Sequence, residues 1–203
     1  MLNRLRDLLF AVFWIRNGFV GGRPKAIKNK VLTRYGQTDG TWVETGTYKG
    51  ETTRFLAGFG KQVHTIEPER NLYSAAVSSL AHLPNVEVHF GTSEELLPQI
   101  LARVSENCNF WLDGHYSGDQ TFKGKVEFPL LEELSSIAEK CMDGRSLTVF
   151  VDDVCCLSPI YEETFKVNLL DYLVDWARQH KLVWTIENDI FIMRSQSGGS
   201  DVA

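Results

Sequence analysis

The sequence has no apolar run long enough to cross a bilayer and no cysteine pattern typical of a zinc site. Its main apolar run, Leu8–Ile15, is eight residues long, whereas a transmembrane helix needs about 20. The four cysteines form no C-x-x-C pair, and no histidine stands at zinc-ligand spacing beside them. They are Cys108, Cys141, Cys155 and Cys156. We expect a reducing, cytoplasmic setting in which all four act as small apolar side chains, with the adjacent pair in an extended stretch.

Positive charge is scarce beyond the first 36 residues. The 203-residue chain has a net charge of −5, composed of +7 in residues 1–36 and −12 in the remainder. This balance argues against a nucleic-acid binder held by overall positive charge, so we expect no nucleic acid as partner. With 43% apolar and 11% aromatic residues, the chain has the composition of one globular domain.

Residues 1–36 are predicted to form a helical extension that is both basic and apolar. One interpretation docks its apolar run on the chain's own domain or on a second copy, as in a homodimer. Another makes it a peripheral anchor at the inner face of a membrane, with basic side chains facing anionic lipid. These side chains are Arg23, Lys25, Lys28, Lys30 and Arg34. We favour docking over this anchor and over an uncleaved export signal, for which no A-x-A site follows the run.

From Thr41 onward, short apolar runs alternate with helical patterns, which indicates a parallel α/β sheet. The expected strands are 41–44, 62–67, 86–90, 108–113, 147–152, 182–187 and 190–194. The expected helices are 51–58, 71–82, 93–104, 129–140 and 161–180. Residues 37–196 are thus predicted to form one α/β domain with a doubly wound, mostly parallel seven-stranded sheet, followed by a disordered tail, 197–203. The glycine-rich stretch 114–126 is expected to be a mobile lid over a bound small molecule.

The first strand runs into the motif E-T-G-T-Y-K-G, residues 44–50. In a doubly wound sheet, the ligand crevice lies at the carboxyl ends of the strands around the first one. Gly46 lets the backbone pass close to a ligand, and Gly50 allows tight packing at the start of the helix. The acid Glu44 suits a cationic or amino-bearing ligand, whereas a dinucleotide pyrophosphate would require G-x-G-x-x-G.

Two more strand ends carry residues that suit an adenosine-containing ligand. Glu67 ends the second strand, 23 residues after Glu44, and an acid at that place accepts hydrogen bonds from ribose hydroxyls. Thr92 and Ser93 follow the third strand and are placed to border an adenine. Three such strand ends in succession predict a cofactor site.

These motifs, together with a closing β-hairpin around the turn-forming pair Asn188–Asp189, resemble class I S-adenosylmethionine-dependent methyltransferases. In that family the acid after the first strand lies near the methionine amino group. The resemblance covers residues 40–195 and implies a Rossmann-like fold with S-adenosylmethionine as cofactor. The implied cofactor-binding residues are Glu44, Thr45, Gly46, Tyr48, Gly50, Glu67, Thr92, Ser93 and Asp113.

Three carboxylates follow the fourth and fifth strands, which are neighbours in this fold. They are Asp113, Asp152 and Asp153. Unpaired carboxylates so close together repel one another, and a hard cation such as Mg²⁺ or Ca²⁺ relieves the repulsion. The alternative is helix capping, or ion pairing with Lys123, Lys125 and Arg145.

The three acids resemble the Mg²⁺ ligands of metal-dependent O-methyltransferases of the catechol, caffeoyl-coenzyme A and macrocin types. This resemblance implies Mg²⁺-assisted O-methylation of a small hydroxylated acceptor such as a sugar. Asp113 and His115 would be catalytic, with the His115 imidazole as general base, because its unperturbed pKa is near 6.5. Two alternatives stay open: a metal-independent methyltransferase acting on nitrogen or carbon, and a catalytically idle scaffold with the same fold.

Overall fold

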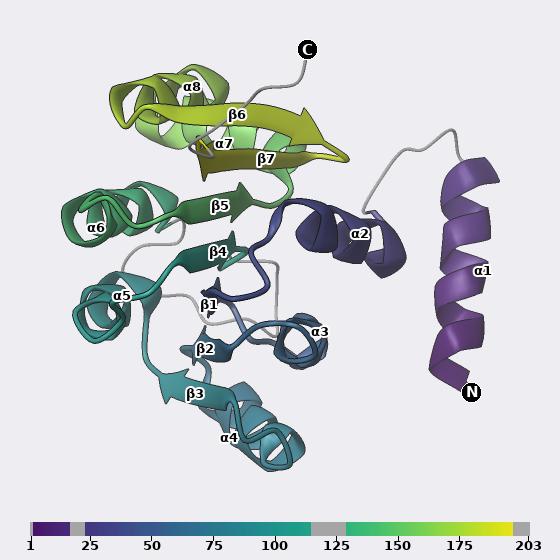
Figure 1. Ribbon diagram of the computed structural model, residues 1–203. Helices are drawn as coiled ribbons and strands as arrows, with labels where there is room; N and C mark the ends of the chain where they lie inside the picture. The colour runs from purple at the N-terminus through teal and green to yellow at the C-terminus, as the bar shows by residue number, and fades with distance from the viewer. Residues whose placement is uncertain (1, 17–22, 115–128, 197–203) are drawn as a thin grey trace.

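The protein is described by a computed structural model over residues 2–16, 23–114 and 129–196, and its centre is a seven-stranded sheet (Figure 1). The strand order is β3 (Val86–Phe90), β2 (Gln62–Glu67), β1 (Thr41–Thr45), β4 (Cys108–Leu112), β5 (Leu147–Val151), β7 (Ile190–Ser195) and β6 (Leu182–Glu187). The first five are parallel, and β7 is antiparallel to both β5 and β6. The predicted doubly wound sheet with its closing hairpin is confirmed.

Helices cover both faces of this sheet. They are α2 (Lys25–Tyr35), α3 (Glu51–Ala57), α4 (Arg70–Leu80), α5 (Ser93–Leu101), α6 (Leu130–Cys141), α7 (Val154–Phe165) and α8 (Leu169–Gln179), whereas α1 (Leu2–Arg16) lies farther out (Figure 1). In Figure 1, α5 and α6 lie on one side of the strands, and α2 and α3 lie on the other. Each side has its own core, one around Phe110 and Val149 and the other around Trp111 and Phe150. Side chains alternate along a strand, so neighbouring residues of β4 and β5 serve opposite cores.

The prediction of one long helix over residues 161–180 is wrong. The structure has two helices there, because Lys166 adopts a left-handed conformation with φ of +58° and ends α7. Asn168 then begins α8, its side chain accepting a hydrogen bond from the Asp171 backbone N–H at 3.1 Å. Such a cap satisfies a backbone donor that the start of a helix leaves unpaired.

Two of the four cysteines behave differently from the expectation. Cys108 and Cys141 are buried, as small apolar side chains would be. Cys155 and Cys156 are exposed and lie in the first turn of α7 rather than in an extended stretch. The helix starts at Val154, with only two residues between it and the end of β5, and both thiols lie on its exposed side.

Helix α2 packs on the sheet as part of the second core. Val31 and Leu32 have no exposed surface and lie in the cluster around Trp111 and Phe150. At the end of α2, Arg34 donates hydrogen bonds to both carboxylate oxygens of Glu187, at 2.7 and 2.8 Å. The second half of the segment 1–36 thus contacts the sheet, and the division of the chain at residues 36 and 196 stays a prediction.

Helix α1 presents apolar side chains to solvent. In Figure 1 it lies outermost, beyond α2 and α3. Trp14 is buried, whereas the other large apolar residues after position 8 are exposed. They are Leu9, Phe10, Val12, Phe13 and Ile15. Among the helices that the structure describes, none is long and apolar enough to span a bilayer.

Candidate functional site

The loop after β1 approaches the end of β4 so closely that only glycine fits. Gly46 has φ of +91°, and a Cβ added there would lie 2.9 Å from the Asp113 carbonyl oxygen. The backbone N–H groups of Gly46 and Thr47 both donate to the Ile66 carbonyl at 3.1 Å, which fixes the loop. Bare backbone beside the strand ends is what a closely approaching ligand requires.

Glu44 lies beneath this loop and is fully enclosed. Its Oε2 accepts hydrogen bonds from the hydroxyls of Thr53, at 2.5 Å, and Thr65, at 2.7 Å. Burial raises the pKa of the Glu44 carboxyl to about 7, although the two hydroxyls act in the opposite direction. Its expected contact with a methionine amino group stays a prediction.

Glu67 joins the end of β2 to the same loop. Its Oε2 accepts a hydrogen bond from the Tyr48 backbone N–H at 2.8 Å, and its Oε1 accepts one from the Glu69 N–H at 3.0 Å. Burial raises its pKa, against the effect of these two donors. Each carboxylate oxygen has a second lone pair, so Glu67 can still accept a hydrogen bond from a ribose hydroxyl.

Near the end of β3, the buried Thr92 Oγ1 makes no hydrogen bond with any described residue. Near the end of β1, the buried Thr45 hydroxyl lies beside the Glu133 carboxylate. Unpaired buried polar atoms are costly, and a polar ligand would relieve that cost. Thr92 immediately precedes α5, beside the buried Ser93, so both predicted adenine-side residues border this region.

Sequence reasoning missed Glu133, because its place in the first turn of amphipathic α6 reads as an ordinary surface acid. Its side chain is only 2% exposed. Burial raises the pKa of its carboxyl to about 7, while the hydroxyls of Ser93 and Thr45 lower it. Because Thr45 is a predicted cofactor-binding residue, the buried Glu133 carboxyl beside it borders the predicted cofactor site.

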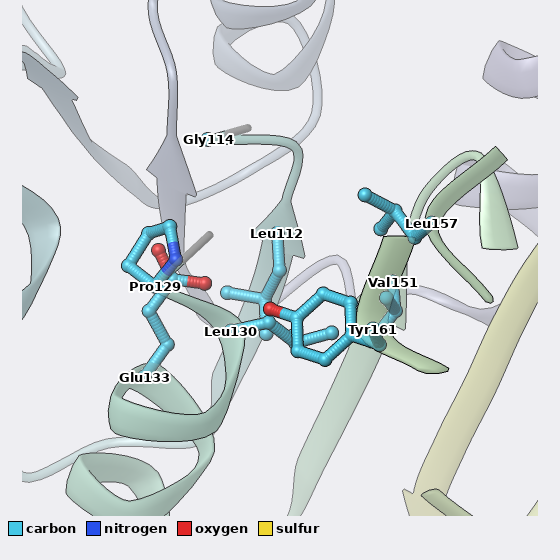
Figure 2. A pocket seen from close by; sticks show the side chains of 8 residues that line it. All are labelled: Leu112, Gly114, Pro129, Leu130, Glu133, Val151, Leu157 and Tyr161. Carbon is cyan, nitrogen blue, oxygen red and sulfur yellow. The ribbon is translucent and has the colours of Figure 1, made fainter. Parts of the chain in front are cut away.

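A small cavity lies between β4, β5 and the starts of α6 and α7. Its volume is about 10 Å³, which holds about one water molecule. Figure 2 shows the Tyr161 hydroxyl and the Glu133 carboxylate directed toward each other across it. The lining residues are Leu112, Gly114, Pro129, Leu130, Glu133, Val151, Leu157 and Tyr161.

The structure brings the three predicted acids together. Asp113, Asp152 and Asp153 each place a carboxylate oxygen within 4.8 Å of the others. Asp113 and Asp152 continue the alternation of β4 and β5, so both fall on the side of Trp111 and Phe150, the side that α2 covers. Asp152 is completely buried, and Asp153 has a left-handed φ of +51°.

Lys28 of α2, one of the bases that would face lipid in the membrane-anchor alternative, lies beside these acids. Its Nζ donates hydrogen bonds to Asp152 Oδ2 and, at 3.3 Å, to Asp153 Oδ1. The only signal in the sequence is the spacing of Lys28, Val31, Leu32 and Tyr35 along one helix face. Of the partners proposed from the sequence, Arg145 pairs with Asp143 instead, and Lys123 and Lys125 lie outside the described residues.

Burial and mutual repulsion raise the pKa values of two acids in this cluster. Burial raises the pKa of Asp152 to about 8, and the Asp113 charge adds to this effect while Lys28 opposes it. Burial likewise raises the pKa of Asp113 to about 7, with Lys28 again acting in the opposite direction. For Lys28, burial lowers the pKa, but attraction to Asp152, Asp113 and Asp153 outweighs it and raises the value. The ammonium is therefore firmly charged.

Other basic residues of the segment 23–36 also contact acids of this chain. Arg23 pairs with Asp189 at 3.2 Å, and Lys25 pairs with Glu51. Together with Lys28 and Arg34, four of the five bases that would face lipid in the membrane-anchor alternative thus pair with acids of this chain. The peripheral membrane contact stays a prediction. The proposed base His115 and the lid 114–126, apart from Gly114, lie outside the described residues.

No protein-family model and no curated protein matches the sequence. Solved structures do match. One is a candidate methyltransferase from Streptococcus mutans in complex with S-adenosylhomocysteine, at 16% identity and a TM-score of 0.53, covering 86% of this chain and 98% of that one. A second is an rRNA methylase from Streptococcus thermophilus, at 19% identity and 0.50, covering 86% and 97%.

A third similar structure is a candidate caffeoyl-CoA O-methyltransferase from Staphylococcus aureus, at 12% identity and a TM-score of 0.50, covering 93% of this chain and 90% of that one. At identities this low the likeness concerns the fold. Together with the strand order, it shows that the chain has the Rossmann-like fold of class I S-adenosylmethionine-dependent methyltransferases.

Proposed function

We propose that this protein is an S-adenosylmethionine-dependent methyltransferase that methylates a hydroxyl group of a small acceptor such as a sugar. The observation that carries the proposal is the contact between the two halves of the site. The Gly46 backbone, on the cofactor side, lies directly against the Asp113 carbonyl, on the side of the acid cluster. A methyl donor on the loop and an acceptor at the acids would therefore meet.

The residues around the loop fit the cofactor. The loop turns at Gly46, where the neighbouring Asp113 backbone leaves no room for a side chain, and the buried Thr92 hydroxyl lacks a hydrogen-bond partner among the described residues. Glu67 keeps lone pairs for ribose hydroxyls. Gly46 and Thr45 would border the methionine part, Glu67 the ribose, and Thr92 and Ser93 the adenine.

When bound, S-adenosylmethionine supplies a methyl group whose bond to sulfur breaks as the acceptor oxygen binds the methyl carbon, leaving the electron pair on neutral S-adenosylhomocysteine. The protein's own task is then to align the acceptor oxygen and to remove its proton. Asp152 Oδ1, which is buried and accepts no hydrogen bond within the described ranges, can receive the acceptor hydroxyl. His115 is the proposed base that takes the hydroxyl proton.

One feature of the acid cluster suits the predicted Mg²⁺, and another opposes its binding. Three convergent carboxylates are the oxygen ligands that a hard cation prefers. Two of them, however, already hold the Lys28 ammonium. No step of the proposed reaction is routed through a metal ion, and the described residues do not test the Mg²⁺ expected from the sequence.

Transfer of a labelled methyl group to a panel of sugars, catechols, amines and RNA tests the proposal. We expect wild type to transfer the label to a hydroxylated small molecule and Asp152→Asn to lose this transfer. Label on an amine or on RNA would contradict the assignment to oxygen and to small acceptors. Failure of the wild type to bind S-adenosylhomocysteine in calorimetry would instead favour the idle-scaffold alternative.

A further inference from the structure

The position of Lys28 is fixed by the packing of helix α2 on the sheet. Val31 and Leu32, one turn further along α2, are completely buried in the second core. Arg34 and Tyr35 fix the end of the helix to Glu187 on β6. The Lys28 side chain is 19% exposed, so its ammonium reaches the acids from inside the fold rather than from a flexible surface position.

The ammonium lies where a bridging metal ion would have to lie. A divalent ion shared by Asp152 and Asp153 needs bonds of roughly 2.0–2.6 Å to one oxygen of each. Lys28 Nζ already donates to Oδ2 of Asp152 and to Oδ1 of Asp153. A metal ion between the same two residues would either displace Lys28 or face its positive charge at short range, where like charges repel.

We propose that Lys28 is the resident cation of this carboxylate cluster and fills the place of a divalent metal ion. A lysine ammonium has three N–H donors, and the described residues accept from two directions only, at Asp152 and Asp153. The remaining donor and the unpaired Asp152 Oδ1 form a donor–acceptor pair that suits a hydroxyl group. Lys28 is thus a positioning residue for the acceptor, and this second part alone depends on the proposed function.

Binding of Mn²⁺ to the full chain, measured by electron paramagnetic resonance, tests the metal part without any acceptor. Lys28→Met removes the charge at similar length, and Lys28→Gln keeps N–H donors as a second variant in case the first is poorly folded. Lys30→Met, at an exposed position on the same helix, is the matched control. Circular dichroism checks that each variant is folded.

We expect wild type and Lys30→Met to bind Mn²⁺ equally weakly, and the Lys28 variants to bind it at least about tenfold more tightly. Asp152→Asn in the Lys28→Met background should remove the gain. Comparing Lys28→Met with and without Asp152→Asn also subtracts any Mn²⁺ bound by the other described group able to hold a metal, His64, Glu87 and His89. Equal binding by wild type and the Lys28 variants would overturn the proposal.

Methyl transfer gives the second readout once an acceptor is in hand. Wild-type turnover should not change with a chelator, whereas Lys28→Met should raise the acceptor KM and regain activity with added Mg²⁺. A merely structural role for Lys28 predicts no such rescue. Chelator-sensitive wild-type turnover would overturn the metal-free site. Absence of any methyl transfer would count against the proposed function alone, because the Mn²⁺ result does not depend on it.

Discussion

The Lys28 ammonium donates a hydrogen bond to Asp152 across 124 positions of the chain. This pair joins the helix that precedes the sheet to the strand end that carries two of the three acids. The basic segment before the sheet therefore belongs to the candidate site instead of being only an appended targeting element. It also gives the acid cluster a cation that the chain itself encodes.

The first prediction concerns the glycine that separates cofactor and acceptor sides. Gly46→Ala should abolish binding of S-adenosylhomocysteine in calorimetry, because its Cβ would lie 2.9 Å from the Asp113 oxygen. Gly144→Ala is the matched control: Gly144 has a similar φ of +100° but no atom within 4 Å of an added Cβ. Both changes should lower stability by roughly 1–3 kcal/mol, yet only the first should affect binding. Unchanged affinity in Gly46→Ala would remove the cofactor from this loop.

The second prediction concerns the acids themselves. Asp152→Asn should lower methyl transfer by about 100-fold or more, because the acceptor loses its alignment. Affinity for S-adenosylhomocysteine should stay within about twofold of wild type, since the acid is assigned to the acceptor. Equilibrium binding and turnover on the same preparation separate the two effects. Parallel loss of cofactor binding would show that Asp152 serves the cofactor.

The third prediction is a pH dependence of stability that arises from Glu133. Burial raises its pKa from an ordinary 4.5 to about 7, so the folded state disfavours the charged form. The free energy of unfolding of wild type is therefore highest below pH 4.5, where Glu133 is protonated in both states. It falls as the pH rises from 4.5 through 7, because the unfolded state ionises this group more readily. Glu133→Gln, which cannot ionise, should therefore be more stable than wild type at pH 8, by at most about 3 kcal/mol.

Urea unfolding at pH 5 and pH 8 measures this difference, which should fall to about a quarter of its pH 8 value at the lower pH. The exposed neighbour Glu132 provides the control, because Glu132→Gln should follow wild type at both values. A constant gap between Glu133→Gln and wild type would contradict burial of a titrating acid.

The fourth prediction concerns α1. Its run from Leu9 to Ile15 has apolar side chains around the whole helix, without the polar face of an interfacial membrane helix. Such a helix is normally buried against protein. We expect the full chain to self-associate through α1, and a chain starting at Arg23, which keeps α2 and Lys28, to be a monomer in light scattering. A monomeric full chain, or salt-sensitive flotation with anionic vesicles, would contradict this expectation.

The local patterns predicted the sheet well because each strand lies between clear turn signals. The loop after β1 and the convergence of Asp113, Asp152 and Asp153 follow from the same order of strands, since parallel strands end at one edge. The break between α7 and α8 was not predicted, because it depends on the left-handed conformation of Lys166. A lysine in the sequence gives no sign of that conformation.

Lys28 and Glu133 escaped for another reason. A helical period shows which face of α2 is buried, but not which distant strand end that face meets. Glu133 stands where helices usually carry solvated acids, near the N-terminus, and only the packing of α6 against α5, with Thr45 nearby, buries it. Both are long-range effects that a single sequence does not encode in local form.

The most direct test is the electron density of a crystal grown with S-adenosylhomocysteine and Mg²⁺. We expect the cofactor along the loop at Gly46, its ribose at Glu67, its sulfur facing the Lys28–Asp152 pair, and no metal ion between Asp152 and Asp153. Cofactor density away from this crevice, or a bound metal ion that has displaced the Lys28 ammonium, would contradict it.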